Sequence, residues 1–212
     1  MNRQSGAWLE DVTAEEARAL FDDGMPVILP LAMGTGGSAP QLALKAEAMA
    51  VRALAQRLID RLPVVAAPVL DLAAYSAGAS AALSAAIGTP LMLDLVGRLR
   101  AAGARRFVLL ADGEAASSLE ALKAEDLLVV EMGRLGAAPE RLPEVPAQGC
   151  VGEPQTSILL ALDPRSVRMA RLGDAAGASA FKGERILDAR VRDARAIIVK
   201  RWPDLAVPRP RG

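Results

Sequence analysis

Residues 26–31 have the sequence Pro-Val-Ile-Leu-Pro-Leu, an apolar run between two segments with helical character. A run this short that is apolar at nearly every position is typical of a strand buried on both faces, as in a parallel sheet. The helix before it is predicted to begin at a capping box, Thr13–Glu16, and to end near Asp23. A glycine-rich loop at 34–40 and a long Ala/Leu helix over about 41–61 are predicted after it.

The same alternation of strand and helix continues along the chain. Thr89-Pro90 indicates a helix start, because threonine is a good N-cap and proline suits the first helical position. Further strands are predicted over 63–70, 106–110 and 127–131, and further helices over about 89–102, 115–124, 154–162 and from 179. This order predicts one α/β domain over 1–212, a three-layer α/β/α sandwich with a mainly parallel sheet. Ligand sites in such folds lie at the carboxyl ends of the strands.

Composition and charge exclude several classes of partner. The chain has 25 basic and 25 acidic residues, so nothing indicates a nucleic acid or an anionic membrane as a partner. The single cysteine, Cys150, excludes an internal disulfide and predicts a cytoplasmic location. Residues 64–88 carry one charge, but Pro68 and many small residues favour a buried strand and loop over a membrane span. Because aromatic residues make up only 3%, we expect an oligomer interface to supply part of the stability.

Four segments resemble the creatininase (creatinine amidohydrolase) family. Residues 27–31 are similar to the family's first strand, which leads into a Glu-Gln-His-Gly-Pro-His loop. Residues 103–113 resemble the strand that leads into Asn-Gly-His-Gly-Gly-Asn. Residues 152–162 look like the helix start His-Ala-Gly-Glu-x-Glu-Thr-Ser, and residues 177–183 resemble the opening of the last helix. The resemblance implies a creatininase-like fold, hydrolysis of small amides with two divalent metals such as zinc or manganese, and an oligomer.

The residues that match the family's metal ligands do not follow its pattern. The family builds its site largely from histidine and carboxylate, whereas this chain contains no histidine. The positions that match family ligands hold Thr35, Gly37, Ala46, Gly113 and Glu153, and a further carboxylate of some members falls near Ala115. Acids adjoin two of them, since Glu47 follows Ala46 and Glu114 follows Gly113. One matched acid does not hold two ions, so we expect no metal cofactor.

The last motif is kept in part. Cys150 stands near the place of its histidine and Gln155 replaces its second acid, whereas Thr156 and Ser157 match. Cys150 has no imidazole to activate it as a nucleophile. Glu153 would be favoured at a helix start by the helix dipole whatever its function. The candidate pocket residues are Glu153, Glu114, Asp112, Cys150, Gln155 and Tyr75.

Three functions remain open at this point. The first is a catalytically inactive creatininase-like protein, a pseudoenzyme that acts as a structural or regulatory subunit or binds a small polar ligand. It would form a homo- or hetero-oligomer, in the latter case with an active relative. The second is an atypical amide hydrolase that uses Glu153, Glu114, Asp112 and Glu47 with one metal or none.

The third is a nucleotide-binding module, because Gly34, Thr35, Gly36 and Gly37 open a loose G-x-G-x-x-A pattern that ends at Ala39. Pro40 removes an amide from that helix start, and the run coincides with the family's ligand loop. Small residues that fill a vacated metal pocket are the simpler explanation of this loop.

Overall fold

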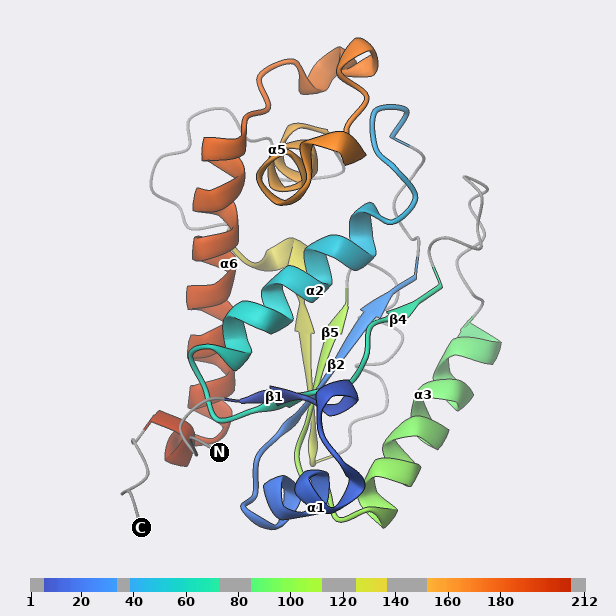
Figure 1. Ribbon diagram of the computed structural model, residues 1–212, viewed down its shortest axis with the longest axis vertical. Helices are drawn as coiled ribbons and strands as arrows, with labels where there is room; N and C mark the ends of the chain where they lie inside the picture. The colour runs from blue at the N-terminus through green and yellow to red at the C-terminus, as the bar shows by residue number, and fades with distance from the viewer. Residues whose placement is uncertain (1–5, 34–38, 73–84, 112–124, 137–151, 207–212) are drawn as a thin grey trace.

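The computed structural model describes residues 6–33, 39–72, 85–111, 125–136 and 152–206 (Figure 1). Within these residues, six parallel strands form the sheet in the order β1-β3-β2-β5-β6, and β4 also pairs with β2. The strands are β1 (Ala7–Trp8), β2 (Val27–Ala32), β3 (Val65–Ala66), β4 (Leu70–Asp71), β5 (Phe107–Ala111) and β6 (Leu127–Glu131). The predicted α/β fold with a mainly parallel sheet is therefore confirmed.

Helices cover both faces of this sheet. The α-helices are α1 (Ala14–Asp22), α2 (Ala46–Ile59), α3 (Ala85–Ala101), α5 (Glu153–Leu162) and α6 (Ala180–Arg201). Short 3-10 helices are η1 (Leu9–Asp11), η3 (Met132–Arg134), η4 (Pro164–Ser166), η5 (Met169–Arg171), η6 (Gly173–Ala175) and η7 (Pro203–Ala206). None of the helices in the described part of the chain is both long and apolar enough to cross a membrane.

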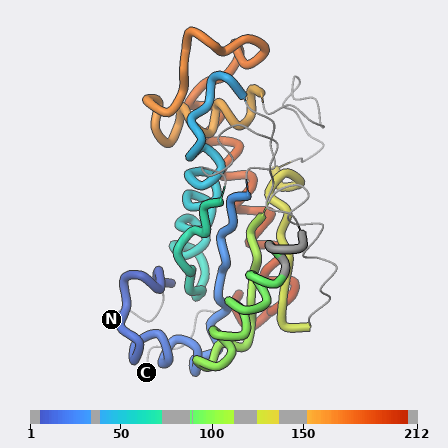
Figure 2. The backbone as a smooth tube through the Cα atoms, turned by 90° about the vertical axis from the view of Figure 1, so that its right-hand side faces the viewer, coloured from blue at the N-terminus to red at the C-terminus, as the bar shows by residue number. Residues whose placement is uncertain are grey.

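Alternate residues of the strands face opposite helical layers. Ile28 and Val108 pack in one buried cluster with side chains of α2 and α6. Val27 and Phe107, their neighbours along the strands, pack in a second cluster with side chains of α1 and α3. Figure 2 shows α2 beside β2, and Figure 1 shows α3 on the opposite side of the strands from α2 and α6. Because both faces are covered, β2 and β5 are buried at every position, as the apolar runs predict.

Local sequence signals place several elements correctly. The Thr13 side chain accepts a hydrogen bond from the backbone N–H of Glu16, and the Glu16 carboxylate accepts one from that of Thr13, so the predicted capping box is present. Ser179 caps α6 in the same way, since its hydroxyl accepts from the backbone N–H of Lys182. The strands predicted near 106–110 and 127–131 are β5 and β6.

The second predicted strand, over 63–70, is wrong as one continuous element. It consists of β3, which pairs with the start of β2, and β4, which pairs with its end. Pro68 lies between the two pieces, and a proline has no N–H to donate to a ladder. The two-residue strand β1 was not predicted, because so short an element has no periodicity to detect.

Two predicted helix starts are also wrong. The helix predicted from 41 begins at Ala46, because the segment before it forms a turn in which Leu42 makes an isolated bridge with Val167. The helix predicted from Pro90 begins five residues earlier, at Ala85, so Pro90 lies inside α3. Proline keeps a helical φ there, but it leaves one carbonyl of the first turn without its donor. The helix predicted over 115–124 lies outside the described residues.

Candidate functional site

The described candidates lie at the starts of α2 and α5, two helices that pack on each other, and the start of α2 contacts the residue after β2. The structure describes four of the residues singled out from the sequence there, Ala46, Glu47, Glu153 and Gln155. Gly34, Thr35, Gly36, Gly37, Tyr75, Asp112, Gly113, Glu114, Ala115 and Cys150 lie outside the described residues. The geometry below therefore concerns the candidate residues on α2 and α5.

The start of α2 is tied to the end of β2 by an acid. Glu47 lies in the first turn of α2, and its Oε1 accepts a hydrogen bond of 2.9 Å from the backbone N–H of Met33. Ala46, the residue before it, is buried in an apolar cluster with Ile158 and Leu159 of α5. This position, which matches a metal ligand of the family, thus holds a methyl group packed in the core.

Glu153 is engaged by a lysine. It is the first residue of α5, and its Oε1 lies 2.5 Å from the Nζ of Lys182 on α6. The same ammonium donates a hydrogen bond of 3.0 Å to the carbonyl oxygen of Gly177. The pair is partly shielded, because the side chain of Glu153 is 21% exposed and that of Lys182 is 37% exposed. The acid therefore ties α5 to the start of α6.

Two glycines make this approach of α5 and α6 possible. A Cβ at Gly177 would lie 2.8 Å from Oε2 of Glu153, so a larger residue would displace the carboxylate. A Cβ at Gly183 would overlap the backbone carbonyl of Ser157, so the two helices touch there through their backbones. These glycines begin and end the segment 177–183 that resembles the family, and their place in it is explained by packing.

Thr156 and Ser157, which match the family's motif, form hydrogen bonds with backbone groups. Both are fully buried. The hydroxyl of Thr156 donates a hydrogen bond of 2.8 Å to the carbonyl of Gly152 and accepts one of 3.1 Å from Nε2 of Gln41. The hydroxyl of Ser157 accepts one of 3.2 Å from the N–H of Ser179, at the N-cap of α6. Gln155, which replaces an acid of the family, is only half-buried on the same helix.

The far end of α5 is fastened to α2 by charge. Asp163, which follows α5, accepts a hydrogen bond from the hydroxyl of Ser166 and pairs with Lys45, just before α2. The hydroxyl first, and then the ammonium, hold the pKa of the Asp163 carboxyl below its usual range. Asp163, which sequence analysis did not single out, thus serves the α2–α5 contact.

Sequence reasoning missed the partners of the retained acid. Lys182 stands within the quoted segment 177–183, but it lies 29 residues from Glu153, and no local spacing links the two. Gln41 was predicted to begin a helix. Instead, its side-chain Nε2 donates a hydrogen bond to the hydroxyl of Thr156, which lies 115 residues later in the chain. A lysine on the last helix opposite a lone acid is the signal that could have suggested the ion pair.

The described ligand positions do not fit a two-metal centre. Ala46 offers no donor atom, and Glu153 already has an ammonium on its carboxylate. Among the residues that the structure describes, no three His, Cys, Asp or Glu side chains converge as metal ligands would. Two bridged ions require several anionic or imidazole ligands that point to one place.

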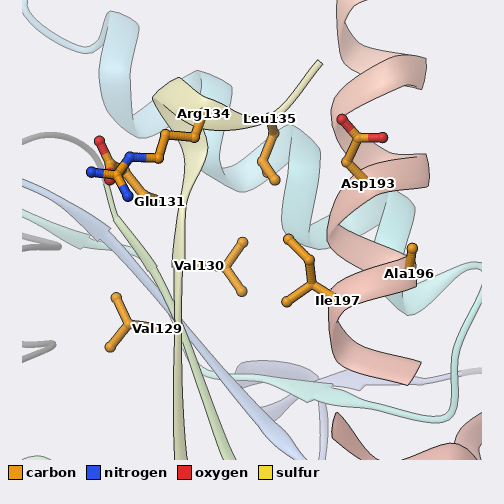
Figure 3. Close-up of a pocket in the computed structure, with 8 residues that line it drawn as sticks. All are labelled: Val129, Val130, Glu131, Arg134, Leu135, Asp193, Ala196 and Ile197. Atoms are coloured by element: carbon orange, nitrogen blue, oxygen red, sulfur yellow. The ribbon is translucent and has the colours of Figure 1, made fainter. Parts of the chain in front are cut away.

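A cavity of about 470 Å³ lies elsewhere, between β6 and α6 (Figure 3). It is lined by Val129, Val130, Glu131, Arg134, Leu135, Asp193, Ala196 and Ile197. None of the candidates from the sequence lines it. This hollow is therefore separate from the candidate site at the start of α5.

Comparison with known proteins identifies the fold. No family model matches the chain, and no curated protein matches it. The solved structure titled "Creatininase Mn" has a TM-score of 0.76 to this chain and is 19% identical to it, over 92% of this chain and 98% of that one. The chain has the creatininase fold.

Two further solved structures agree with the first. A mutant creatininase has a TM-score of 0.77 at 20% identity, and a creatinine amidohydrolase (creatininase) has one of 0.73 at 20% identity. Each match covers 92% of this chain and 98% of the other. At this identity the creatininase likeness describes the fold, and the activity has to be argued from the residues themselves.

Proposed function

We propose that this chain is a catalytically inactive relative of the creatininases that acts as a structural or regulatory subunit or binds a small polar ligand. The observation that carries the proposal is the ion pair between Glu153 and Lys182. Of the family's ligand positions that the structure describes, Glu153 alone holds an acid, and that acid ties two helices together.

The pattern of kept and changed residues supports the same proposal. The kept Thr156 and Ser157, with Gly177 and Gly183, each have a packing or hydrogen-bonding role in the contact of α5 with α6. The changed Ala46 adds to the core that α2 shares with α5. Selection for the fold alone would keep the residues that pack or hydrogen-bond between α5 and α6. It would also tolerate the change of a metal ligand to alanine at position 46.

Metal content tests the proposal directly. The protein should be purified without a histidine tag, incubated with zinc or manganese, dialysed and analysed for bound metal. We expect far less than one tightly bound ion per chain. The Glu153→Gln variant is the control, because an ion held by this acid would be absent from the variant. Near-stoichiometric metal that resists a chelator and disappears in Glu153→Gln would contradict the proposal and favour the acid-based amide hydrolase.

Turnover is the second test. The wild-type protein should be assayed with creatinine and other small cyclic amides, with and without added zinc or manganese. We expect no hydrolysis above that of buffer. Hydrolysis that Glu153→Gln abolishes would show an unusual enzyme, and tight binding of a nucleotide would instead favour the glycine-loop hypothesis.

A further inference from the structure

The hollow between β6 and α6 combines an apolar wall with charged groups (Figure 3). Its volume is about 470 Å³, and sites for small molecules typically have such volumes, mostly apolar walls and a few polar groups. The apolar residues that line it are Val129, Val130, Leu135, Ala196 and Ile197. The charged residues that line it are Glu131, Arg134 and Asp193. The chemistry of a ligand that fits here follows from these two groups.

The apolar wall continues the core that β6 shares with α6. Val130, Ala194 and Ile198 are buried together in one cluster. Figure 3 shows the side chains of Val130 and Ile197 facing each other across the hollow, one from β6 and one from α6. Ile197 is 38% exposed although it is a large apolar residue. A hydrocarbon group placed between these two side chains would remove apolar surface from water, which favours binding.

Two of the three charged side chains neutralise each other. Nε of Arg134 lies 2.7 Å from Oε2 of Glu131. The side chain of the arginine is 75% exposed, so most of it lies in water, whereas that of the acid is 23% exposed. This ion pair adds no net charge to the hollow, and the third charged residue decides its sign.

Asp193 leaves the hollow with a negative charge. It is half-buried, and its Oδ2 accepts a hydrogen bond of 2.7 Å from the backbone N–H of Gly136. Cγ of Arg190 lies close to Gly136, but among the residues that the structure describes no lysine or arginine forms an ion pair with Asp193. A carboxylate that is partly removed from water and has no counter-ion favours a cation beside it.

We propose that this hollow binds a small organic cation with an apolar body, of the alkylammonium class. Its nitrogen donates a hydrogen bond to the carboxylate of Asp193, and its hydrocarbon chain lies between Val130 and Ile197. Asp193 and Ile197 are one turn apart on the same side of α6, so a single small ligand reaches both. The apolar wall disfavours a bare metal ion, and the charge of Asp193 disfavours an anion. The site is separate from Glu153 and goes beyond the function proposed above.

Titration calorimetry of the full chain with hexylammonium chloride at neutral pH tests the proposal. Hexanol and hexanoate are the matched probes, because they keep the chain length and change only the charge of the head group. We expect the wild type to bind hexylammonium about tenfold more tightly than hexanol, and hexanoate more weakly still. No binding of hexylammonium at millimolar concentration, or equal binding of hexanoate, would overturn the proposal.

The acid is tested by Asp193→Asn, which keeps an oxygen for the N–H of Gly136. This variant should bind hexylammonium about tenfold more weakly and hexanol as the wild type does. Asp174→Asn is the matched control, because it removes an exposed acid in η6, outside the hollow, and it should leave both affinities unchanged. An equal loss in the two variants would mean attraction to the overall charge of the chain and would overturn the proposal.

A larger side chain in the wall keeps the proposal falsifiable if Asp193→Asn does not fold. Ile197→Trp should weaken the binding of hexylammonium and of hexanol alike, about tenfold, because the indole ring occupies the space of the hydrocarbon chain. Ile197→Val is the matched control and should bind both probes nearly as the wild type does. Unchanged binding in Ile197→Trp would place the ligand elsewhere and overturn the proposal. These titrations measure neither metal nor turnover, so this proposal and the proposed function can fail separately.

Discussion

The ammonium of Lys182 supplies a positive charge to the one described acid kept from the family's ligand set. A lysine forms a compact point charge with three donors, and here two of its contacts are the carboxylate of Glu153 and the carbonyl of Gly177. Glu153 also lies in the first turn of α5, where the positive end of the helix dipole favours a carboxylate. These interactions explain why an acid is retained at this position without reference to a metal.

The first prediction concerns that acid. Glu153→Gln should lower the free energy of unfolding by about 0.5–1 kcal/mol, because it removes a dipole interaction and a partly exposed ion pair. Chemical denaturation of Glu153→Gln, Lys182→Met and the double variant gives the interaction free energy between the two side chains. We expect it to be about 0.5–1 kcal/mol as well. Unchanged or higher stability in Glu153→Gln, together with the disappearance of a bound ligand or an activity, would show that the acid serves chemistry instead.

The second prediction concerns the closest backbone contact. Gly183→Ala should destabilise the protein by about 3 kcal/mol or prevent folding, because the new methyl group would overlap the carbonyl of Ser157. Gly97→Ala is the control, since position 97 lies inside α3 with open space around it. Alanine should stabilise that helix by about 0.5–1 kcal/mol. Equal melting temperatures for the two variants would contradict the close contact of α5 with α6.

At the scale of elements, the sequence predicts what depends on neighbouring residues. The capping box at Thr13, the start of the last helix near 179 and the apolar runs of β2, β5 and β6 are local signals, and each is confirmed. The starts of α2 and α3 depend on contacts with distant parts of the chain, such as the bridge from Leu42 to Val167. Periodicity contains no information on such contacts, so these boundaries were wrong.

The third prediction concerns the ion pair that joins α3 to the start of β6. Arg100 donates two hydrogen bonds to Asp126, and this lowers the pKa of the Asp126 carboxyl. A lowered pKa in the folded state means that the stabilisation is full above the unfolded pKa, about 3.9, and disappears as the pH falls through the folded pKa. Asp126→Asn should therefore be less stable than wild type at neutral pH and equally stable in acid.

Urea denaturation across that pH range is the measurement. Asp94→Asn, which removes an exposed pair within α3, is the control and should change stability little at any pH. A difference between Asp126→Asn and wild type that persists unchanged in strong acid would contradict the assignment to the carboxylate.

At the scale of the molecule, the fold was easier to predict than the site. The order of strands and helices and four family-like segments indicated the fold, and the solved creatininases share it. The site was predicted only as a set of positions. The contact of Glu153 with Lys182, and the burial of Ala46 against α5, depend on how three helices meet.

The fourth prediction concerns the whole molecule. Because the described contacts of α2, α5 and α6 consist of apolar packing, ion pairs and hydrogen bonds, a chelator should leave the melting temperature unchanged. Differential scanning calorimetry with and without excess EDTA is the measurement, and a known zinc-dependent creatininase provides the positive control. A fall of several degrees with EDTA, reversed by added zinc, would contradict the expectation, since a ligand that binds the folded state stabilises it.

The ammonium of Lys182 also sets a condition for building a metal site on this scaffold. Histidines introduced into the loops would offer imidazoles to an ion, but the carboxylate of Glu153 would still be neutralised by its lysine. A protein engineer would have to replace Lys182 first and accept a less firmly docked α6 in that intermediate. Histidine substitutions alone would therefore not complete a metal site at Glu153, and the further change at Lys182 would weaken the contact of α5 with α6.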